Sequence, residues 1–197
     1  MPARPAARSS RDPPFGQACF EGGTIHLAKH TPVELYLLRH GLAYERDPKK
    51  FPDDKLRPLT IEGLEKIREI VRGMLKLGVE FDAIFDSGYA RARQTAEAVT
   101  DAYRIDSRDI REVPALEPDH DPAEIIPVLN SVKDAKRILM VGHEPQLGKL
   151  VRYLTCRDSL TVDFKKGALC RIDFDAVKKA AGKLMWLLPP KVLRKIR

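Results

Sequence analysis

Two short runs of apolar residues limit the folds that this chain can adopt. Residues 33–38 read VELYLL and residues 137–141 read RILMV, so both are almost continuously apolar. Runs of this kind are typical of strands that are buried on both faces of a sheet. They are far shorter than a membrane span, and no apolar run of the sequence approaches that length. The sequence therefore favours a parallel sheet that is covered by helices.

Segments of helical character separate the strands along the chain. Apolar residues recur at helical spacing from Thr60, a predicted N-cap, to about Gly78. The other predicted helices lie at about 90–103, 123–131 and 146–154, and the other predicted strands at about 81–85, 111–113, 169–174 and 184–188. The last two strands can form a hairpin with a short helical insert around 176–181. This alternation predicts an α/β fold: a three-layer α/β/α sandwich with a mostly parallel mixed sheet.

The first 31 residues differ in composition from the rest of the chain. They are rich in Pro, Ala, Arg, Ser and Gly, and they show neither periodicity nor the apolar core of a secretory signal. We predict a disordered basic tail over residues 1–31 and a single domain over residues 32–197. An Arg-rich start also fits an organellar transit peptide, but its prolines disfavour the helix of such a presequence.

Charge and cysteine content narrow the partners and the compartment. The formal net charge of +7 favours anionic partners, although much of the excess lies at the two ends of the chain. Aromatic residues make up 7% of the chain and do not alternate with basic ones, so we expect no nucleic-acid partner. Cys19, Cys156 and Cys170 are an odd number without metal-ligand spacing, which indicates free thiols and a reducing, cytoplasmic location.

Charged and polar residues follow three of the predicted strands where each strand ends. Arg39, His40 and Gly41 end the first run, Gly142 and His143 end the second, and residues 87–91 follow the strand between them. The carboxyl ends of parallel strands converge on one edge of a sheet, where α/β proteins bind ligands. That edge would gather two arginines and two histidines, which together suit a dianionic phosphoryl group.

Each of these residues also has a purely structural explanation. Arg39 and His40 can be a solvated strand end, Arg91 can be a surface residue in the first turn of a helix, and His143 can be a buried core histidine. A cation in the first turn of a helix is mildly unfavourable unless an anion lies nearby. Chance placement of several such residues at matching positions is much less probable than chance placement of one, which favours a functional site.

The motifs together resemble those of the histidine phosphatase superfamily, the phosphoglycerate-mutase-like group. The segments that carry the resemblance are Arg39-His40-Gly41, Ser87-x-x-x-Arg91-Ala92-x-Gln94-Thr95 and Gly142-His143-Glu144-Pro145. The further segments Asp54-x-x-Arg57-Pro58-Leu59-Thr60-x-x-Gly63 and Trp186-x-Leu188-Pro189-Pro190 are similar to those of SixA-type phosphohistidine phosphatases. The resemblance extends from about Val33 to the C-terminus.

The resemblance implies a phosphoglycerate-mutase-like fold and a role for each matching residue. His40 matches the nucleophile that carries the phosphoryl group, and Arg39, Arg91 and His143 match the pocket that binds its oxygens. The family needs no metal or cofactor, and the sequence shows no cluster of metal ligands. These roles agree with the chemistry of phosphoryl transfer, which depends on positioning and electrostatic stabilisation.

The sequence departs from the family pattern at several positions. Many members have a carboxylate general acid after the third strand, and Glu117 is the candidate, with Asp119 and Asp121 as alternatives; all three can equally be solvated loop residues. Gly88 stands where the family usually has proline, which predicts a looser turn before Arg91. Leu42 stands where related sequences often have a polar residue. Arg57 can extend the basic rim of the site, but we interpret it as a surface residue.

The leading hypothesis is a phosphatase that removes phosphate from phosphohistidine on a protein, as in a signalling relay. The chain lacks a long insertion that would form a lid, so we expect an open site. The alternatives are a phosphatase of a small phosphate ester and a non-catalytic protein that binds anions or nucleic acid. A Glu117 side chain directed at the phosphate site would favour the ester, because an ester leaving group needs a proton donor more than phosphohistidine does.

Overall fold

The computed structural model describes residues 32–132, 134–155 and 159–196. The predicted disordered tail, as well as Cys19 and Cys156, therefore lies outside the described residues. The strands are β1 (Val33–Arg39), β2 (Ala83–Asp86), β3 (Ile110–Glu112), β4 (Arg137–Gly142), β5 (Leu169–Phe174) and β6 (Lys183–Leu188). The helices are α1 (Ile61–Lys76), α2 (Ala90–Tyr103), α3 (Ile125–Ser131), α4 (Gln146–Thr155) and α5 (Pro190–Leu193).

The six strands form one mixed sheet with the order β3-β2-β4-β1-β5-β6. Three neighbouring pairs of strands are parallel: β1 with β4, β4 with β2, and β2 with β3. β5 runs antiparallel to both β1 and β6, so the last two strands form the predicted hairpin. Because β1 has neighbours on both sides and helices on both faces, residues 35–38 are completely or almost completely buried.

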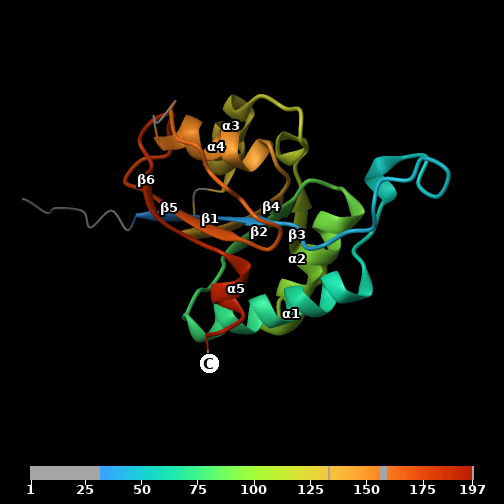
Figure 1. The fold of residues 1–197 in the computed structure, drawn as a ribbon. Helices are drawn as coiled ribbons and strands as arrows, with labels where there is room; N and C mark the ends of the chain where they lie inside the picture. The colour runs from blue at the N-terminus through green and yellow to red at the C-terminus, as the bar shows by residue number, and fades with distance from the viewer. Residues whose placement is uncertain (1–31, 133, 156–158, 197) are drawn as a thin grey trace, which may run out of the picture.

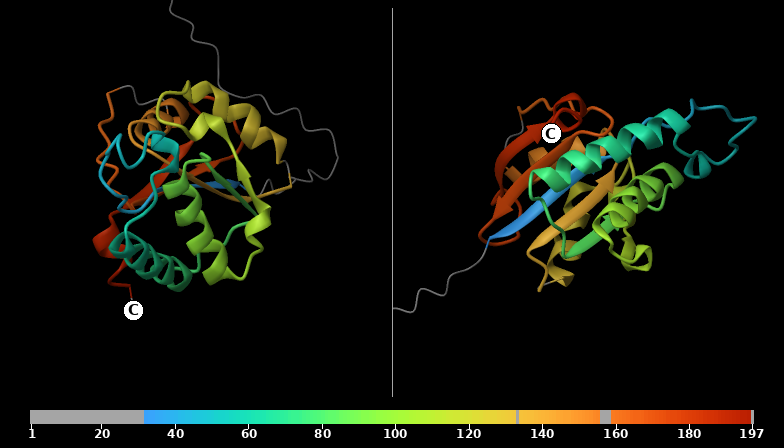
Figure 2. Two further views of the ribbon diagram at one scale, coloured as in Figure 1. Left: turned by 90° about the vertical axis from the view of Figure 1, so that its right-hand side faces the viewer. Right: turned by 90° about the horizontal axis from the view of Figure 1, so that it is seen from below.

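Helices cover the two faces of the sheet, as Figures 1 and 2 show. α3 and α4 pack on one face against alternate residues of the central strands, such as Leu35, Leu37 and Met140. α1, α2 and α5 cover the other face, where Tyr36 and Leu38 of β1 are buried. The predicted three-layer α/β/α sandwich is thus confirmed. Within the described residues, no helix combines the length and the apolar character needed to cross a membrane.

The structure corrects the prediction in a few segments. Residues 176–181 form bends and a turn instead of a helical insert, with Ala180 at a φ of 62°. Backbone N–H groups of this connection donate to the end of α4, from Ala180 to Tyr153 O (3.2 Å) and from Gly182 to Leu154 O (2.9 Å). β2 is displaced by one or two residues from the predicted position, and the short helix α5 was not predicted.

Candidate active site

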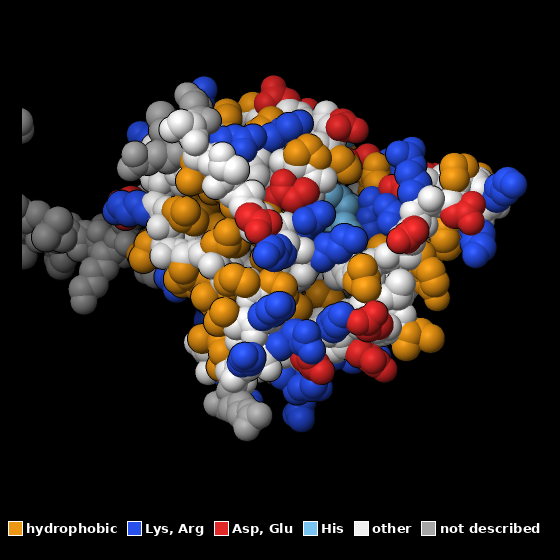
Figure 3. Space-filling view, in the orientation of Figure 1, with side chains coloured by type: hydrophobic (Ala, Val, Ile, Leu, Met, Phe, Trp, Pro, Cys, Tyr) orange, Lys and Arg blue, Asp and Glu red, His pale blue; other side chains and the backbone are white. Residues whose placement is uncertain are grey.

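Three predicted strand ends meet at one edge of the sheet. The register pairs Arg39 of β1 with Gly142 of β4, and Asp86 of β2 with Val141 of β4. The residues that follow these positions therefore lie side by side, and Figure 3 shows histidine side chains at this edge among basic ones. The structure thus brings Arg39, His40, Arg91 and His143 together, as the sequence predicted.

His40 is buried, with 6% of its surface exposed, and its orientation is fixed by two hydrogen bonds. Its backbone N–H donates to Gly142 O (3.1 Å), and its ring Nδ1 lies 2.7 Å from Gly41 O. Because a carbonyl oxygen can only accept, Nδ1 carries the proton and Nε2 keeps its lone pair. Burial, and next the neighbouring His143, hold the pKa of His40 well below its ordinary value. A neutral imidazole with a free Nε2 has the form that a nucleophile requires.

His143 lies next to His40, with ring centroids 4.8 Å apart. Its Nε2 is 2.7 Å from Ser87 Oγ, whereas its Nδ1 is buried and has no hydrogen-bond partner among the described residues. Burial, followed by the charges of Arg91 and Arg39, lowers the pKa of His143 to about 3. The site therefore holds two uncharged imidazoles beside two arginines. A bound anion would stabilise the positive charges of these arginines.

Arg39 and Arg91 each use only part of their hydrogen-bonding capacity within the protein. Arg39 Nη1 donates to Phe164 O (2.6 Å), and Arg91 donates to Asp54 through Nη1 to the backbone O (2.8 Å) and Nη2 to Oδ2 (3.0 Å). The Nε atoms of both arginines are buried without a partner among the described residues. Burial lowers the pKa of both guanidinium groups. A buried cation with unused donors is costly unless an anion binds to it.

Asp54 and Arg57 extend this cluster; sequence reasoning gave Asp54 no role there and preferred a surface position for Arg57 to a place on the basic rim. Asp54 accepts from Arg57 Nε through Oδ1 (2.8 Å) and from Arg91 through Oδ2, so one carboxylate holds two arginines. Burial alone would raise the pKa of Asp54, but the hydrogen bond from Arg57 and the charge of Arg91 hold it below its ordinary value. The interpretation of Arg57 as a surface residue is wrong, because its side chain is 16% exposed and its charge acts on His143. The Asp-x-x-Arg spacing was the available signal.

Glu117 lies near this edge, but it forms an ion pair with Lys55, whose Nζ is 2.9 Å from Glu117 Oε1. The Glu117 side chain is 15% exposed, and its charge acts on Tyr89, whose ring centroid is 4.7 Å from that of His143. Of the two alternatives, Asp119 is exposed and Asp121 accepts from Ala123 N (2.8 Å) as the cap of a short 3₁₀ helix. Glu117 is therefore paired with Lys55, and neither aspartate has a hydrogen bond to His40.

Gly88 shapes the turn before α2 in a way that proline could not. Its φ is +77°, and its N–H donates to Asp86 Oδ1 (2.5 Å), whereas proline is restricted to negative φ and has no N–H. Asp86 is completely buried, and its Oδ2 lies 2.9 Å from Arg93 Nε as a charge contact without hydrogen-bond geometry. This hydrogen bond holds the turn that presents Ser87 and Arg91, and the looser turn expected at Gly88 stays a prediction.

The segment after Gly41 packs closely on the start of α1. Thr60 caps α1 by accepting from Gly63 N (2.9 Å), and its backbone N–H donates to Leu42 O (2.9 Å). A Cβ atom on Gly63 would come within 2.0 Å of Leu42 O, so only glycine permits this approach. The half-buried Leu42 is thereby held through its backbone, and the turn that carries His40 rests on a helix.

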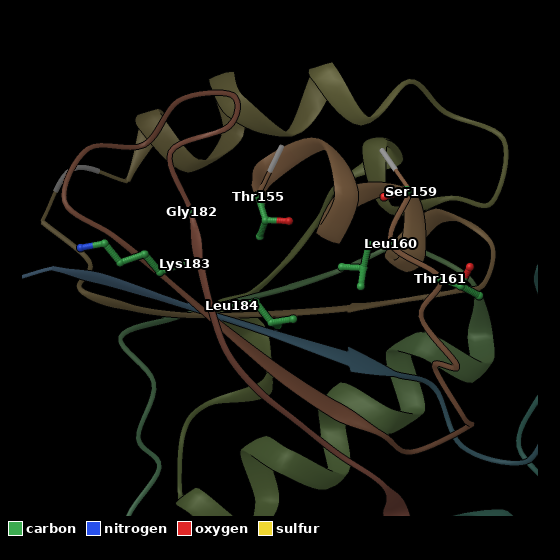
Figure 4. Close-up of a pocket in the computed structure, with 7 residues that line it drawn as sticks. All are labelled: Thr155, Ser159, Leu160, Thr161, Gly182, Lys183 and Leu184. Carbon is green, nitrogen blue, oxygen red and sulfur yellow. The ribbon is translucent and has the colours of Figure 1, made fainter. Parts of the chain in front are cut away.

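A large pocket lies beside the end of α4 and the start of β6, away from His40, and Figure 4 labels the residues that line it. It has a volume of about 800 Å³ and is lined by residues from the end of α4 and the start of β6, including Thr155, Lys183 and Leu184. Lys183 pairs with Asp173 of β5, and Asp173 pairs with Glu34 near the amino end of β1. This pocket is thus at the opposite end of the sheet from His40. Within the described residues, no group of three or more His, Cys, Asp or Glu side chains could hold a metal ion.

Comparisons with known proteins agree with this geometry. The sequence model of the histidine phosphatase superfamily (branch 1) matches residues 35–117. Phosphohistidine phosphatase SixA of Escherichia coli (strain K12) is 26% identical over 160 residues, which are 80% of this chain and 94% of SixA. The structure of the protein histidine phosphatase SixA complexed with tungstate gives a TM-score of 0.71 at 25% identity, and covers 81% of this chain and 98% of that one.

The fold is also that of phosphoglycerate mutase from Bacillus anthracis (strain Sterne), with a TM-score of 0.63 at 15% identity over 84% of this chain and 96% of that one. This chain belongs to the histidine phosphatase superfamily and is a phosphatase with the phosphoglycerate-mutase-like fold. The predicted family and class of enzyme are confirmed. The matched region contains Arg39, His40 and Arg91 and ends before His143.

Proposed function

We propose that this protein removes phosphate from phosphohistidine on a protein through a phosphoryl intermediate on His40. The observation that carries the proposal is the Nδ1 contact with Gly41 O, which leaves the Nε2 lone pair beside the arginines. The similarity to SixA over 94% of its length supports phosphohistidine as the substrate class. We further propose that the protein acts in a signalling relay in the cytoplasm, and that residues 32–197 form its single domain.

The proposed reaction has two displacements at phosphorus. His40 Nε2 forms a bond to phosphorus while the phosphorus–nitrogen bond of the substrate breaks, and the substrate imidazole leaves. Water then attacks the phosphohistidine, the bond to Nε2 breaks, and phosphate is released, so one water is consumed. Gly41 O stabilises the positive charge that develops on the His40 ring while Nε2 is bonded to phosphorus.

Arg39, Arg91 and His143 are the proposed phosphate pocket. Arg39 and Arg91 have guanidinium N–H groups left over from their contacts with the protein, and the charges of both act on His143. Such donors, fixed before the reaction, stabilise the charge that spreads over the phosphoryl oxygens in the transition state. These groups supply positive charge and hydrogen bonds from the protein itself, so we propose no metal or cofactor.

The test is phosphate release from a phosphohistidine-bearing protein and from a panel of small phosphate esters. We expect release from phosphohistidine, and a loss of at least about a thousandfold in kcat for His40→Ala. Asp82→Ala, at the other end of the sheet, is the matched control and should retain the wild-type rate. No release from any substrate by a folded protein would refute the proposal and leave a binding site for anions.

A small phosphate ester is the second candidate substrate, because Glu117 is partly buried near Tyr89 and could serve as the general acid. Glu117→Gln separates the two candidates. If the substrate is phosphohistidine, this variant should keep its kcat within about threefold, since the leaving imidazole needs little protonation in the transition state. A much larger fall, together with faster turnover of one ester than of phosphohistidine, would replace the proposed substrate with that ester.

A further inference from the structure

A groove begins directly beside the turn that carries His40. It has a volume of about 260 Å³ and lies between α1, α5 and the backbone of Gly41 and Leu42. Its floor is mainly apolar: the half-buried Leu42 and Pro190 line it, together with Ile67 and Ile70, which are almost completely buried. The groove is thus large enough for one or two side chains of a bound partner and is next to the proposed nucleophile.

The rim of the groove is basic. Lys66, Lys166, Lys191 and Arg194 surround the apolar floor, and Figure 3 shows basic side chains gathered below the histidines, over α1 and α5. Lys66 is paired with Glu62, and Arg194 with Glu69. Within the described part of the chain, no ion pair joins Lys166 or Lys191 to a carboxylate. The charge of Glu45 also acts on Lys166, so four cations against three carboxylates leave the rim with an excess of positive charge.

Lys166 connects the groove to the phosphate pocket. Burial, and next the charges of Arg39, Arg57 and Arg91, lower the pKa of Lys166. The following residue, Gly167, donates its N–H to Arg39 O (3.0 Å), so the segment that carries Lys166 is attached to the end of β1. A ligand that reaches from His40 into the groove would therefore meet positive charge along its whole length.

We propose that this groove docks an acidic segment of the phosphorylated protein, with an apolar side chain against Leu42 and Pro190 and a carboxylate between Lys166 and Lys191. The proposal rests on the proposed function, because it identifies which phosphohistidine proteins the same site accepts. Complementary charge selects the partner: a carboxylate relieves the repulsion among the rim cations, whereas a basic segment would add to it. The apolar floor adds contact area that a small phosphorylated molecule cannot fill.

The experiment compares two synthetic phosphohistidine peptides. One has leucine and glutamate residues around the phosphohistidine, and the other has glutamine in place of each glutamate. We expect the wild type to show a kcat/KM about tenfold higher for the acidic peptide. In Lys191→Glu this preference should disappear, whereas Lys183→Glu, a charge reversal on β6 at the other end of the sheet, should keep it. Equal kcat/KM for both peptides in the wild type would refute the docking proposal while leaving the proposed function intact.

Direct binding keeps the two proposals separate if neither peptide is hydrolysed. The fluorescence anisotropy of the labelled, unphosphorylated acidic peptide reports docking without turnover. We expect the wild type to bind this peptide about tenfold more tightly than Lys191→Glu does at low salt, with a smaller difference at high salt. This result would support the docking proposal even if the proposed function fails. Equal binding to both proteins, or equal binding of the acidic and the neutral peptide, would overturn the docking proposal.

Discussion

Arginine side chains have different surroundings at the two ends of this sheet. At the amino end, Arg137 of β4 donates to two carboxylates, Asp82 (2.8 Å) and Glu80, and these hydrogen bonds, Asp82 first, raise its pKa. At the carboxyl end, burial lowers the pKa of Arg91, which is 4% exposed and shares the carboxylate of Asp54 with Arg57. Among the ion pairs of the described residues, Arg39 has no carboxylate partner.

The difference separates charges that stabilise the fold from charges that are available to a ligand. In a partly exposed arginine with two carboxylate partners, the charge is already compensated and the N–H donors are already used, so the residue gains little from binding an anion. A buried arginine with unused donors raises the free energy of the unliganded protein and lowers that of the complex with an anion. The contrast in pairing, rather than the number of arginines, thus marks the carboxyl end as the candidate active site.

The strongest test of this contrast is to remove one arginine from each end. Arg91→Ala should lower kcat/KM for a phosphohistidine substrate by at least about a hundredfold, close to 3 kcal/mol of transition-state stabilisation. Arg137→Ala should leave kcat/KM unchanged. Urea unfolding of both variants gives the control for folding. Comparable losses of activity at the two ends would contradict the distinction.

The pH dependence of stability should also differ between the two ends. His143 has a folded pKa of about 3, below the ordinary value, so the unfolded chain takes up a proton first as the pH falls. The free energy of unfolding should therefore fall from about pH 6.5 down to about pH 3, by at most about 1.4 kcal/mol per pH unit for this group.

The His143→Gln variant removes this contribution, so its stability should depend less on pH in that interval. The pKa of His40 is lowered as well, so His40 should still make the free energy of unfolding of the variant depend on pH to some extent. The pKa of Asp82 at the amino end is also lowered, mainly by Arg137, but a carboxylate loses its contribution only at more acidic pH. Urea titrations across the pH range measure both effects, and an unchanged slope in His143→Gln would show that His143 is not buried in its neutral form.

The third prediction concerns Asp54, which positions Arg91 without itself offering a donor to an anion. Asp54→Asn keeps the shape of the side chain but removes the charge that holds Arg91 and Arg57. We expect kcat to fall about tenfold, because the guanidinium is no longer fixed in one orientation. Inhibition by tungstate, a tetrahedral dianion, should change by less than about threefold, since both arginines remain. A large loss of tungstate binding with unchanged kcat would contradict a positioning role.

The smallest effect is expected for Asp82→Ala at the amino end. Asp82 accepts from the backbone N–H groups of Lys136 (2.9 Å) and Arg137 (2.8 Å) as well as from the Arg137 side chain. Their loss at a partly exposed site should lower the free energy of unfolding by about 1 kcal/mol, with unchanged kcat/KM. A fall in activity greater than the fall in stability explains would mean that the two ends of the sheet are coupled.

Local patterns predicted most of this fold, and contacts between distant segments account for the errors. The burial of β1 and β4 follows from their continuous apolar runs, and the meeting of Arg39, Arg91 and His143 follows from the convergence of parallel strand ends. Residues 176–181 are good helix formers, but so short a helix is hard to nucleate, and hydrogen bonds to the end of α4 replace its own.

The missed parts of the site depend on contacts that residue types do not reveal, whether the partners are distant or adjacent in sequence. Arg57 joins the cluster only because Asp54 also contacts Arg91, 37 residues further along the chain. Gly88 has a positive φ and donates to the carboxylate of Asp86, two residues earlier, and the burial of that carboxylate could not be predicted from the sequence. The partner of His40 Nδ1 is a backbone carbonyl, and a backbone contact leaves no signature in side-chain types.

The hydrogen bond from His40 Nδ1 to Gly41 O has a chemical consequence beyond catalysis. Phosphohistidine exists as two positional isomers, and a ring whose Nδ1 is engaged can take the phosphoryl group only at Nε2. The intermediate of this protein would therefore be a single isomer. Its phosphorus resonance, or an antibody that distinguishes the isomers, would reveal which ring nitrogen had reacted, so a trapped intermediate would report the tautomer directly.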